Sequence, residues 1–165
     1  GRSDLSASSR RYDGFITALH EAGLEVEPAL VQQGDYTYRS GLKAAEKLLA
    51  HRKPPTAIFA SNDDMAAATV AMAHRRHLDV PGDITVCGFD DTAMASTIWP
   101  ELTTIRQPIR EMTAWAVSAA VRIVKARRAG ERAKPEQKML PYTLVRRESD
   151  AAPSLARRGT RGKNT

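Results

Sequence analysis

Apolar residues recur along the chain with two spacings, one typical of helices and the other of short buried strands. Helical spacing, with apolar residues three and four positions apart, occurs over four segments: 10–22, 38–51, a segment that begins near Asp63, and a longer one that begins at Pro108. Pro108 suits a first helical turn, and Gly23 and Gly130 are positioned to end the first and the last of these helices. The last helix presents an apolar face that includes Trp115, which we expect to lie in the core.

Four short apolar runs lie between or after these helices and predict strands: 29–31, 56–60, 84–88 and 142–146. Between helix and strand, Val80-Pro81-Gly82-Asp83 has the Pro-Gly order of a type II turn. Strands that alternate with helices at this spacing predict the α/β class, with a parallel sheet and helices on both of its faces.

Composition narrows the class of protein. The 165 residues correspond to one domain or part of a larger protein, and their net charge is +6. Basic residues gather in 122–134 and 157–163, and we interpret both groups as solvated, since no aromatic residues are interleaved with them. The single cysteine, Cys87, fits a reducing compartment, and neither a signal peptide nor an apolar run of membrane-spanning length is visible. We therefore expect a cytoplasmic protein without a membrane partner.

Polar side chains follow two of the predicted strands where each one ends. Asn62, Asp63 and Asp64 come directly after the strand at 56–60, and Asp90 and Asp91 follow the strand at 84–88. Ligands of open α/β sheets bind outside the carboxyl ends of strands, and carboxylates and amides suit a hydroxylated molecule such as a sugar. An alternative stays open: these residues cap a helix and form a turn.

Catalytic readings find less support. The four aspartates could hold Mg²⁺ for phosphoryl transfer, but the sequence has no Gly-rich phosphate loop. His74 and His77 share a helix face without a third ligand nearby, and no Ser–His–Asp arrangement can be argued. We expect a protein that is not an enzyme and that has no metal site and no cofactor.

Several segments in order resemble one known family. These segments are RRYDGFITAL–HEAGL, QQGDYTYRSG, PTAIFASNDDMA and VPGDITVCGFDDTAMASTIWPELTTIRQP. Together they are similar to the effector-binding core of LacI/GalR transcription regulators, over about residues 8–147. The resemblance implies an incomplete half of a type I periplasmic-binding-protein-like fold. It also implies a C-terminal fragment of a regulator that senses a small sugar-like effector.

The resemblance assigns roles to particular residues. The effector-binding positions it implies are Arg11, Tyr36, Asn62, Asp90 and Gln107. The segment that would contribute to a dimer interface includes Met94, Ser96, Ile98 and Trp99. Two other interpretations stay open, namely that Arg11 is an exposed helix residue and that Tyr36 is a half-buried loop aromatic.

The resemblance also divides the chain. Residues 1–107 would form the C-terminal subdomain without its first strand, and 108–140 a crossover helix and linker that pack on an N-terminal subdomain absent from this chain. The last strand would lie in 141–150, before a disordered basic tail at 151–165. Operator DNA would bind through a headpiece absent from this chain, in a homodimer. The alternatives are a sugar-binding protein of an ABC transporter and an α/β enzyme that uses Asp90 or Asp91.

Overall fold

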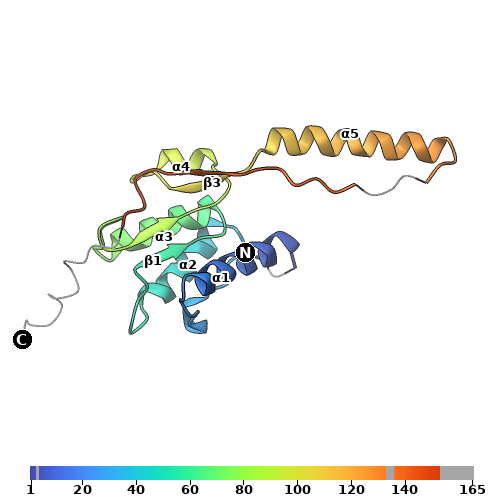
Figure 1. The fold of residues 1–165 in the computed structure, drawn as a ribbon. Coiled ribbons are helices and arrows are strands. Elements are labelled where there is room, and N and C mark those ends of the chain that lie inside the picture. The colour runs from blue at the N-terminus through green and yellow to red at the C-terminus, as the bar shows by residue number, and fades with distance from the viewer. Residues whose placement is uncertain (3, 133–135, 153–165) are drawn as a thin grey trace, which may run out of the picture.

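The computed structural model describes residues 1–2, 4–132 and 136–152. Figure 1 shows a compact body from which one long helix projects. The elements in chain order are α1 (Ser6–Glu21), the 3₁₀ turn η1 (Pro28–Leu30), α2 (Tyr38–Leu49), β1 (Ala57–Phe59), α3 (Asp63–Arg75), β2 (Thr85–Cys87), α4 (Ala93–Thr97), β3 (Thr104–Arg106), α5 (Ile109–Arg128) and β4 (Thr143–Val145).

The core lies where α2 and α3 pack on each other and on the first two strands. Small residues allow the two helices to approach closely: Ala45, Ala66 and Ala73 are all at most 1% exposed. At Gly41 the approach is so close that a Cβ atom would lie 2.7 Å from the Cα atom of Met65. The chain has few aromatic residues to fill its interior. The interior is nevertheless dense, because small residues let the backbones of the two helices lie close together.

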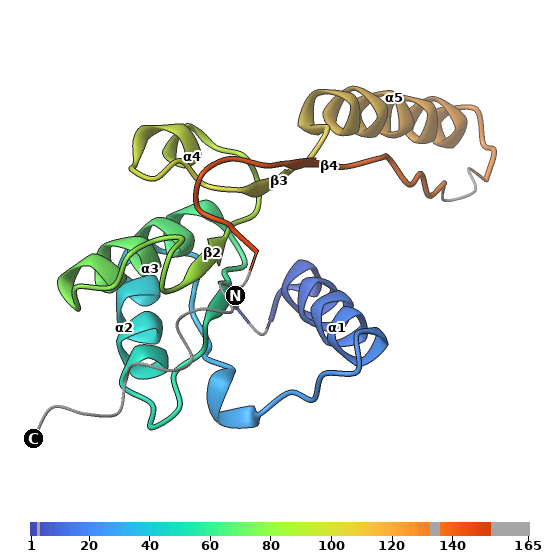
Figure 2. The same ribbon diagram turned by 60° about the vertical axis from the view of Figure 1, so that its left-hand side comes forward.

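β1 and β2 form a parallel pair in which Ile58 lies beside Val86. Ile58 points into the core shared with α2 and α3, whereas Phe59 stacks on Phe15 of α1 at 5.5 Å between ring centroids. Figure 2 shows α1 across the strands from α2 and α3. The predicted α/β class, with a parallel sheet between helices, is therefore confirmed.

The chain then leaves the body through a narrow ribbon. Parallel bridges join Cys87 to Thr103 and Asp90 to Arg106, so β3 continues the sheet edge beyond β2. β3 also pairs with β4, but this pair is antiparallel, an arrangement that sequence reasoning did not anticipate. The ribbon of β3 and β4 leads from the body to α5 (Figures 1 and 2).

α5 differs from the helices of the body because none of its residues is buried. The prediction that Trp115 belongs to the core is wrong for the described residues, since this side chain stays half-buried. The apolar stripe exists, but nothing in the described part of the chain covers it fully.

Two local predictions are also wrong. Residues 29–31 form no strand, because Pro28 starts a 3₁₀ turn in which the N–H groups of Leu30 and Val31 bond to Glu27 and Pro28 carbonyls. The turn at 80–83 is not type II, since Gly82 lacks the positive φ that this type requires. The N–H of Asp83 instead bonds to the carbonyl of Asp79.

The helix ends agree well with the sequence. Gly23 and Gly130 follow α1 and α5 with φ values of 70° and 74°, a conformation that favours glycine. Most of the predicted basic tail lies outside the described residues. Within the described ranges, no helix is both long and apolar enough to cross a membrane.

Candidate functional site

The centre of the site is an ion pair between α1 and the loop after β2. Nη2 of Arg11 lies 3.3 Å from Oδ1 of Asp90, and Nη1 donates to the carbonyl of Ser61 at 2.6 Å. Nε2 of Gln107 donates to the same Asp90 oxygen at 2.7 Å. Three positions that are distant in sequence thus meet at the carboxyl ends of β1 and β2. In this fold class ligands bind at that edge.

The Arg11 guanidinium also stacks over the ring of Phe89, with 3.8 Å between Cζ and the ring centroid. Sequence reasoning did not nominate Phe89, although it directly precedes Asp90. The aromatic face holds the guanidinium flat while its edges remain available for hydrogen bonds. Arg11 is therefore no loosely exposed helix residue: only 16% of its side chain is accessible.

Asp90 has the electrostatics of a group that a ligand could stabilise. Burial raises the pKa of its carboxyl above the ordinary value, and the nearby Asp63 and Asp64 charges raise it further. Arg11 and Gln107 oppose this effect without cancelling it. The backbone is strained as well, since φ is 105° at Asp90 and 55° at Asp91. Such conformations cost on the order of 1–3 kcal/mol each and are typical of functional sites.

Asn62 has a structural task in this arrangement. Its Oδ1 accepts from the backbone N–H of Met65 at 3.0 Å, which caps α3, and its Nδ2 donates to the carbonyl of Tyr36 at 2.8 Å. Only 8% of the residue is exposed. The capping alternative is thus realised, and any contact with a ligand would have to use the remaining N–H or lone pair.

Tyr36 lies beside Arg11 and has a left-handed backbone conformation, with φ of 72°. Its hydroxyl shares a 2.5 Å hydrogen bond with Oγ of Ser8, and its ring centroid lies 5.9 Å from the Arg11 guanidinium. The ring is half-buried and contacts the core. Tyr36 and Asn62 together join the loop before α2 to the end of β1.

Two neighbouring aspartates, Asp63 and Asp91, are engaged by protein groups. Asp63, which is fully buried, accepts from Oγ1 of Thr104 at 2.6 Å and from the N–H of Thr92 at 2.6 Å. Asp91 is paired with Arg106 and Arg147. Among the described residues, no group of three His, Cys, Asp or Glu side chains could hold a metal ion.

Comparison with known proteins identifies the family. The family model of the periplasmic binding protein-like domain matches residues 1–149. The chain belongs to this family. Within it, the matched relatives identify the chain as a LacI/GalR-type effector-binding core.

Two curated relatives illustrate the similarity. Catabolite control protein A of Priestia megaterium is 40% identical over 109 residues, which cover 66% of this chain and 33% of that protein. The HTH-type transcriptional regulator DegA of Bacillus subtilis (strain 168) is 39% identical over 150 residues, 90% of this chain and 43% of that protein. The chain spans about a third to two fifths of the length of these relatives.

A solved structure shows the same fold. The complex of the transcriptional regulator CelR with cellobiose superposes with a TM-score of 0.82 and 33% sequence identity. The match covers 91% of this chain and 45% of the CelR chain.

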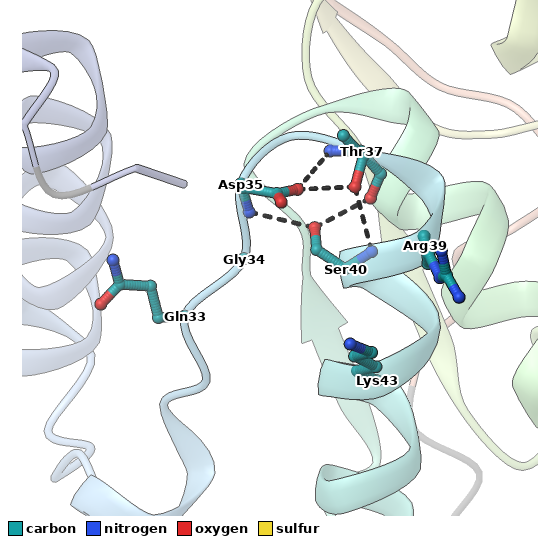
Figure 3. A pocket seen from close by; sticks show the side chains of 7 residues that line it. All are labelled: Gln33, Gly34, Asp35, Thr37, Arg39, Ser40 and Lys43. Carbon is teal, nitrogen blue, oxygen red and sulfur yellow. Dashed lines mark hydrogen bonds between the residues drawn. The ribbon is translucent and has the colours of Figure 1, made fainter.

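In this LacI/GalR-type core, two surface hollows are found among the described residues, and neither is lined by Arg11, Asn62 or Asp90. One hollow of about 320 Å³ opens at the start of α2 (Figure 3). It is lined by Gln33, Gly34, Asp35, Thr37, Arg39, Ser40 and Lys43. Figure 3 shows Asp35, Thr37 and Ser40 bonded to one another. These hydrogen bonds lower the pKa of Asp35 to about 2, so its charge is already satisfied there.

A second hollow of about 370 Å³ lies where the ribbon joins α5 and includes Gln107 among its lining residues. This hollow is connected to Asp90, because the side chain of its lining residue Gln107 donates a hydrogen bond to the Asp90 carboxylate. Both hollows are shallow surface features.

The segment predicted to form a dimer interface lies on and after α4. Trp99 is 71% exposed, and its ring stacks on His74 with 5.8 Å between centroids. Met94 and Ile98 are half-buried and Ser96 is exposed. A large aromatic residue with this exposure, on a rigid support, is typical of a protein contact.

Proposed function

We propose that this chain is the effector-binding and dimerisation part of a DNA-binding transcriptional regulator that senses a small sugar-like ligand. Asp90 would accept hydroxyl groups of the ligand, and Arg11 and Gln107 would donate to its oxygen atoms. Operator DNA would bind through a part of the protein outside this chain. The protein would act in the cytoplasm and would catalyse no reaction.

The observation that carries the proposal is the convergence of Arg11 and Gln107 on one Asp90 oxygen at the sheet edge. The Arg11–Asp90 distance of 3.3 Å is long for a charged pair, and the pKa of Asp90 is raised by burial. The carboxylate is therefore incompletely satisfied by the protein. Ligand hydroxyls would supply the missing hydrogen bonds, each of which contributes about 1–3 kcal/mol when its loss leaves a buried group unpaired.

The relatives support a regulator more than a transporter component. The two curated relatives are named as a control protein and a transcriptional regulator, and CelR was solved with cellobiose bound. A disaccharide in a related core makes sugars the first ligands to try here. None of these names describes an enzyme, which argues against the alternative that uses Asp90 or Asp91 in catalysis.

The open site and the uncovered α5 point to the same missing partner. We infer that residues 108–140 pack on a second subdomain outside this chain, and that this subdomain supplies the other wall of the ligand cleft. Exposed apolar residues along α5 support this arrangement, among them Val117, Val121 and Val124 at 59%, 47% and 49% exposure. Ligand binding between the subdomains would favour one relative orientation, with a coupling of about 1–3 kcal/mol.

Calorimetry on the full-length protein tests the ligand site. A panel of sugars that includes cellobiose, galactose and ribose is titrated into wild type, Asp90→Asn and Arg11→Ala. The matched control is Asp13→Asn, an exposed aspartate on the same helix as Arg11. We expect the first two variants to lose at least about tenfold in affinity. Unchanged affinity in both would refute the site.

Stability separates a binding role from a structural one at Asp90. Its raised pKa means that the folded protein disfavours the ionised form, mainly through burial. Asp90→Asn should therefore weaken ligand binding without lowering the melting temperature of the ligand-free protein. A large loss of stability would assign Asp90 to the fold instead.

The dimer assignment has its own test. Trp99→Ser in the full-length protein should shift sedimentation from dimer towards monomer, because the exposed indole would be buried in the interface. Tyr142→Ser is the control, since Tyr142 is 72% exposed and directly precedes β4, outside the segment on and after α4. Equal sedimentation of the Trp99 variant and wild type would exclude this segment from the interface.

A further inference from the structure

Two consecutive aspartates after β2 have left-handed backbone, and only the first of them meets Arg11 and Gln107. φ is 105° at Asp90 and 55° at Asp91, in a region that favours glycine. Neither position is glycine, so neighbouring groups must hold the segment in this shape. The direction of the Asp90 carboxylate depends on whatever holds it.

Asp91 attaches the loop through two arginines. Its Oδ1 accepts from Nη2 of Arg147 at 2.6 Å, and its Oδ2 accepts from Nε of Arg106 at 2.5 Å. The Asp91 side chain is only 7% exposed. Burial opposes its ionisation, but hydrogen bonds from the two arginines outweigh burial and lower its pKa. We call Asp91 with Arg106 and Arg147 the Asp91 clamp.

One partner of Asp91, Arg147, is itself fixed. Nη1 of Arg147 donates to the carbonyl of Leu102 at 2.8 Å, and its backbone N–H donates to Oγ1 of Thr103 at 2.8 Å. Arg106 belongs to β3, whereas Arg147 follows β4. The clamp therefore ties the strained loop to both strands of the ribbon that leads to α5.

Other bonds hold the loop on both sides of Asp91. The N–H of Asp90 donates to the carbonyl of Ile105 at 2.9 Å, and Asp63 accepts from the N–H of Thr92. With both flanks tied, rotation of the loop is limited by the side chain between them. A side chain held by two guanidinium groups provides that limit.

We propose that Asp91 is a positioning residue: it contacts no ligand, and it holds Asp90 in the orientation that binds one. The inference rests on the proposed function, because it assigns Asp91 a part in the same ligand site. Asp91 also joins that site to the ribbon, so a change in the direction of the ribbon would change the orientation of the Asp90 carboxylate.

The first test needs no ligand. Crystal structures of the full-length wild type and Asp91→Asn are compared. We expect the variant to lose the Arg11 or the Gln107 contact of Asp90, with a changed φ at Asp90. Unchanged φ and unchanged contacts would overturn the proposal. Asp4→Asn is the control, because Asp4 also pairs with an arginine, Arg2, and lies outside the clamp.

A milder variant covers the possibility that Asp91→Asn does not fold. Arg106→Gln removes one half of the clamp, and the Arg106 side chain is 56% exposed, so its loss leaves the interior intact. We expect the same displacement of Asp90 in this variant, with a smaller amplitude. An unmoved Asp90 in Arg106→Gln would count against the proposal.

The second test is a double-mutant cycle with the sugar from the panel that wild type binds. We expect Asp91→Asn to weaken binding by about tenfold when Asp90 is present. In the Asp90→Asn background we expect it to have no further effect on affinity. An equal loss in both backgrounds would mean a purely structural role. If Asp90→Asn alone binds normally, the proposed function fails. If no sugar binds, the crystal structures decide on Asp91 alone.

Discussion

α3 and α5 are both alanine-rich helices with an apolar stripe, yet they have opposite surroundings. Nine residues of α3 are buried, whereas none of the 20 residues of α5 is. α3 packs against α2 and β2, and α5 projects from the body on a two-stranded ribbon (Figure 1). The comparison teaches that an apolar stripe predicts that one face of a helix will be covered, but it does not predict which part of the protein covers that face.

The largest expected effect is in the body. Ile84 is 1% exposed, so Ile84→Ala should lower the free energy of unfolding by about 2–5 kcal/mol, through lost burial and the cavity it leaves. Urea denaturation of the full-length protein measures this change. A loss below about 1 kcal/mol would mean that the body is not the packed core described above.

A smaller effect distinguishes the starts of the two helices. α3 has a side-chain cap from Asn62, and α5 has none at Pro108. Asn62→Ala should cost about 1 kcal/mol of stability. Thr37→Ala is the matched control, since Thr37 caps α2 in the same way. If Asn62 also binds ligand, only Asn62→Ala weakens sugar binding in calorimetry. Equal affinities in the two variants would leave Asn62 with the cap alone.

Acid should destabilise the body partly through Asp35. Its folded pKa of about 2 lies below the ordinary value of 3.8, because Thr37 and Ser40 hydrogen bond to its charged form. The stabilisation is therefore present above about pH 4 and is lost as the pH falls towards 2. Asp35→Asn should flatten the dependence of the melting temperature on pH in this window. Asp13→Asn serves as control, and identical profiles for wild type and Asp35→Asn would contradict the assignment.

The smallest expected effect is on α5. Val121→Ser should change the stability of the 165-residue chain by less than about 0.5 kcal/mol, because the side chain is 47% exposed. In the full-length protein the same change should cost more, if a second subdomain covers this face. Thermal unfolding of both forms measures the difference. Equal small losses in both would leave α5 without the proposed partner.

Sequence reasoning succeeded where local chemistry decides the structure. The ends of α1 and α5 at Gly23 and Gly130, and the cap of α3 at Asn62, follow from backbone conformations and side-chain reach within a few residues. It failed at 29–31, where a short apolar run was interpreted as a strand. Such a run has no preference strong enough to overrule a turn that begins at Pro28.

The candidate site was predicted only in part. That polar groups gather at the ends of β1 and β2 could be inferred from the pattern alone. The meeting of Arg11, Gln107 and Asp90 was expected from the family resemblance alone, because these residues are separated by as many as 79 positions. The roles of Phe89 and Asp91 were missed for the same reason, since each is defined by arginines from other elements.

The sequence by itself determined the α/β class, the order of most elements and the two strand ends that carry polar groups, because periodicity and capping act over short distances. Only the tertiary structure decided that two arginines hold Asp91 and that α5 has no cover within the described chain. Those outcomes depend on contacts between distant segments, and such contacts are selected by the packing of the whole fold.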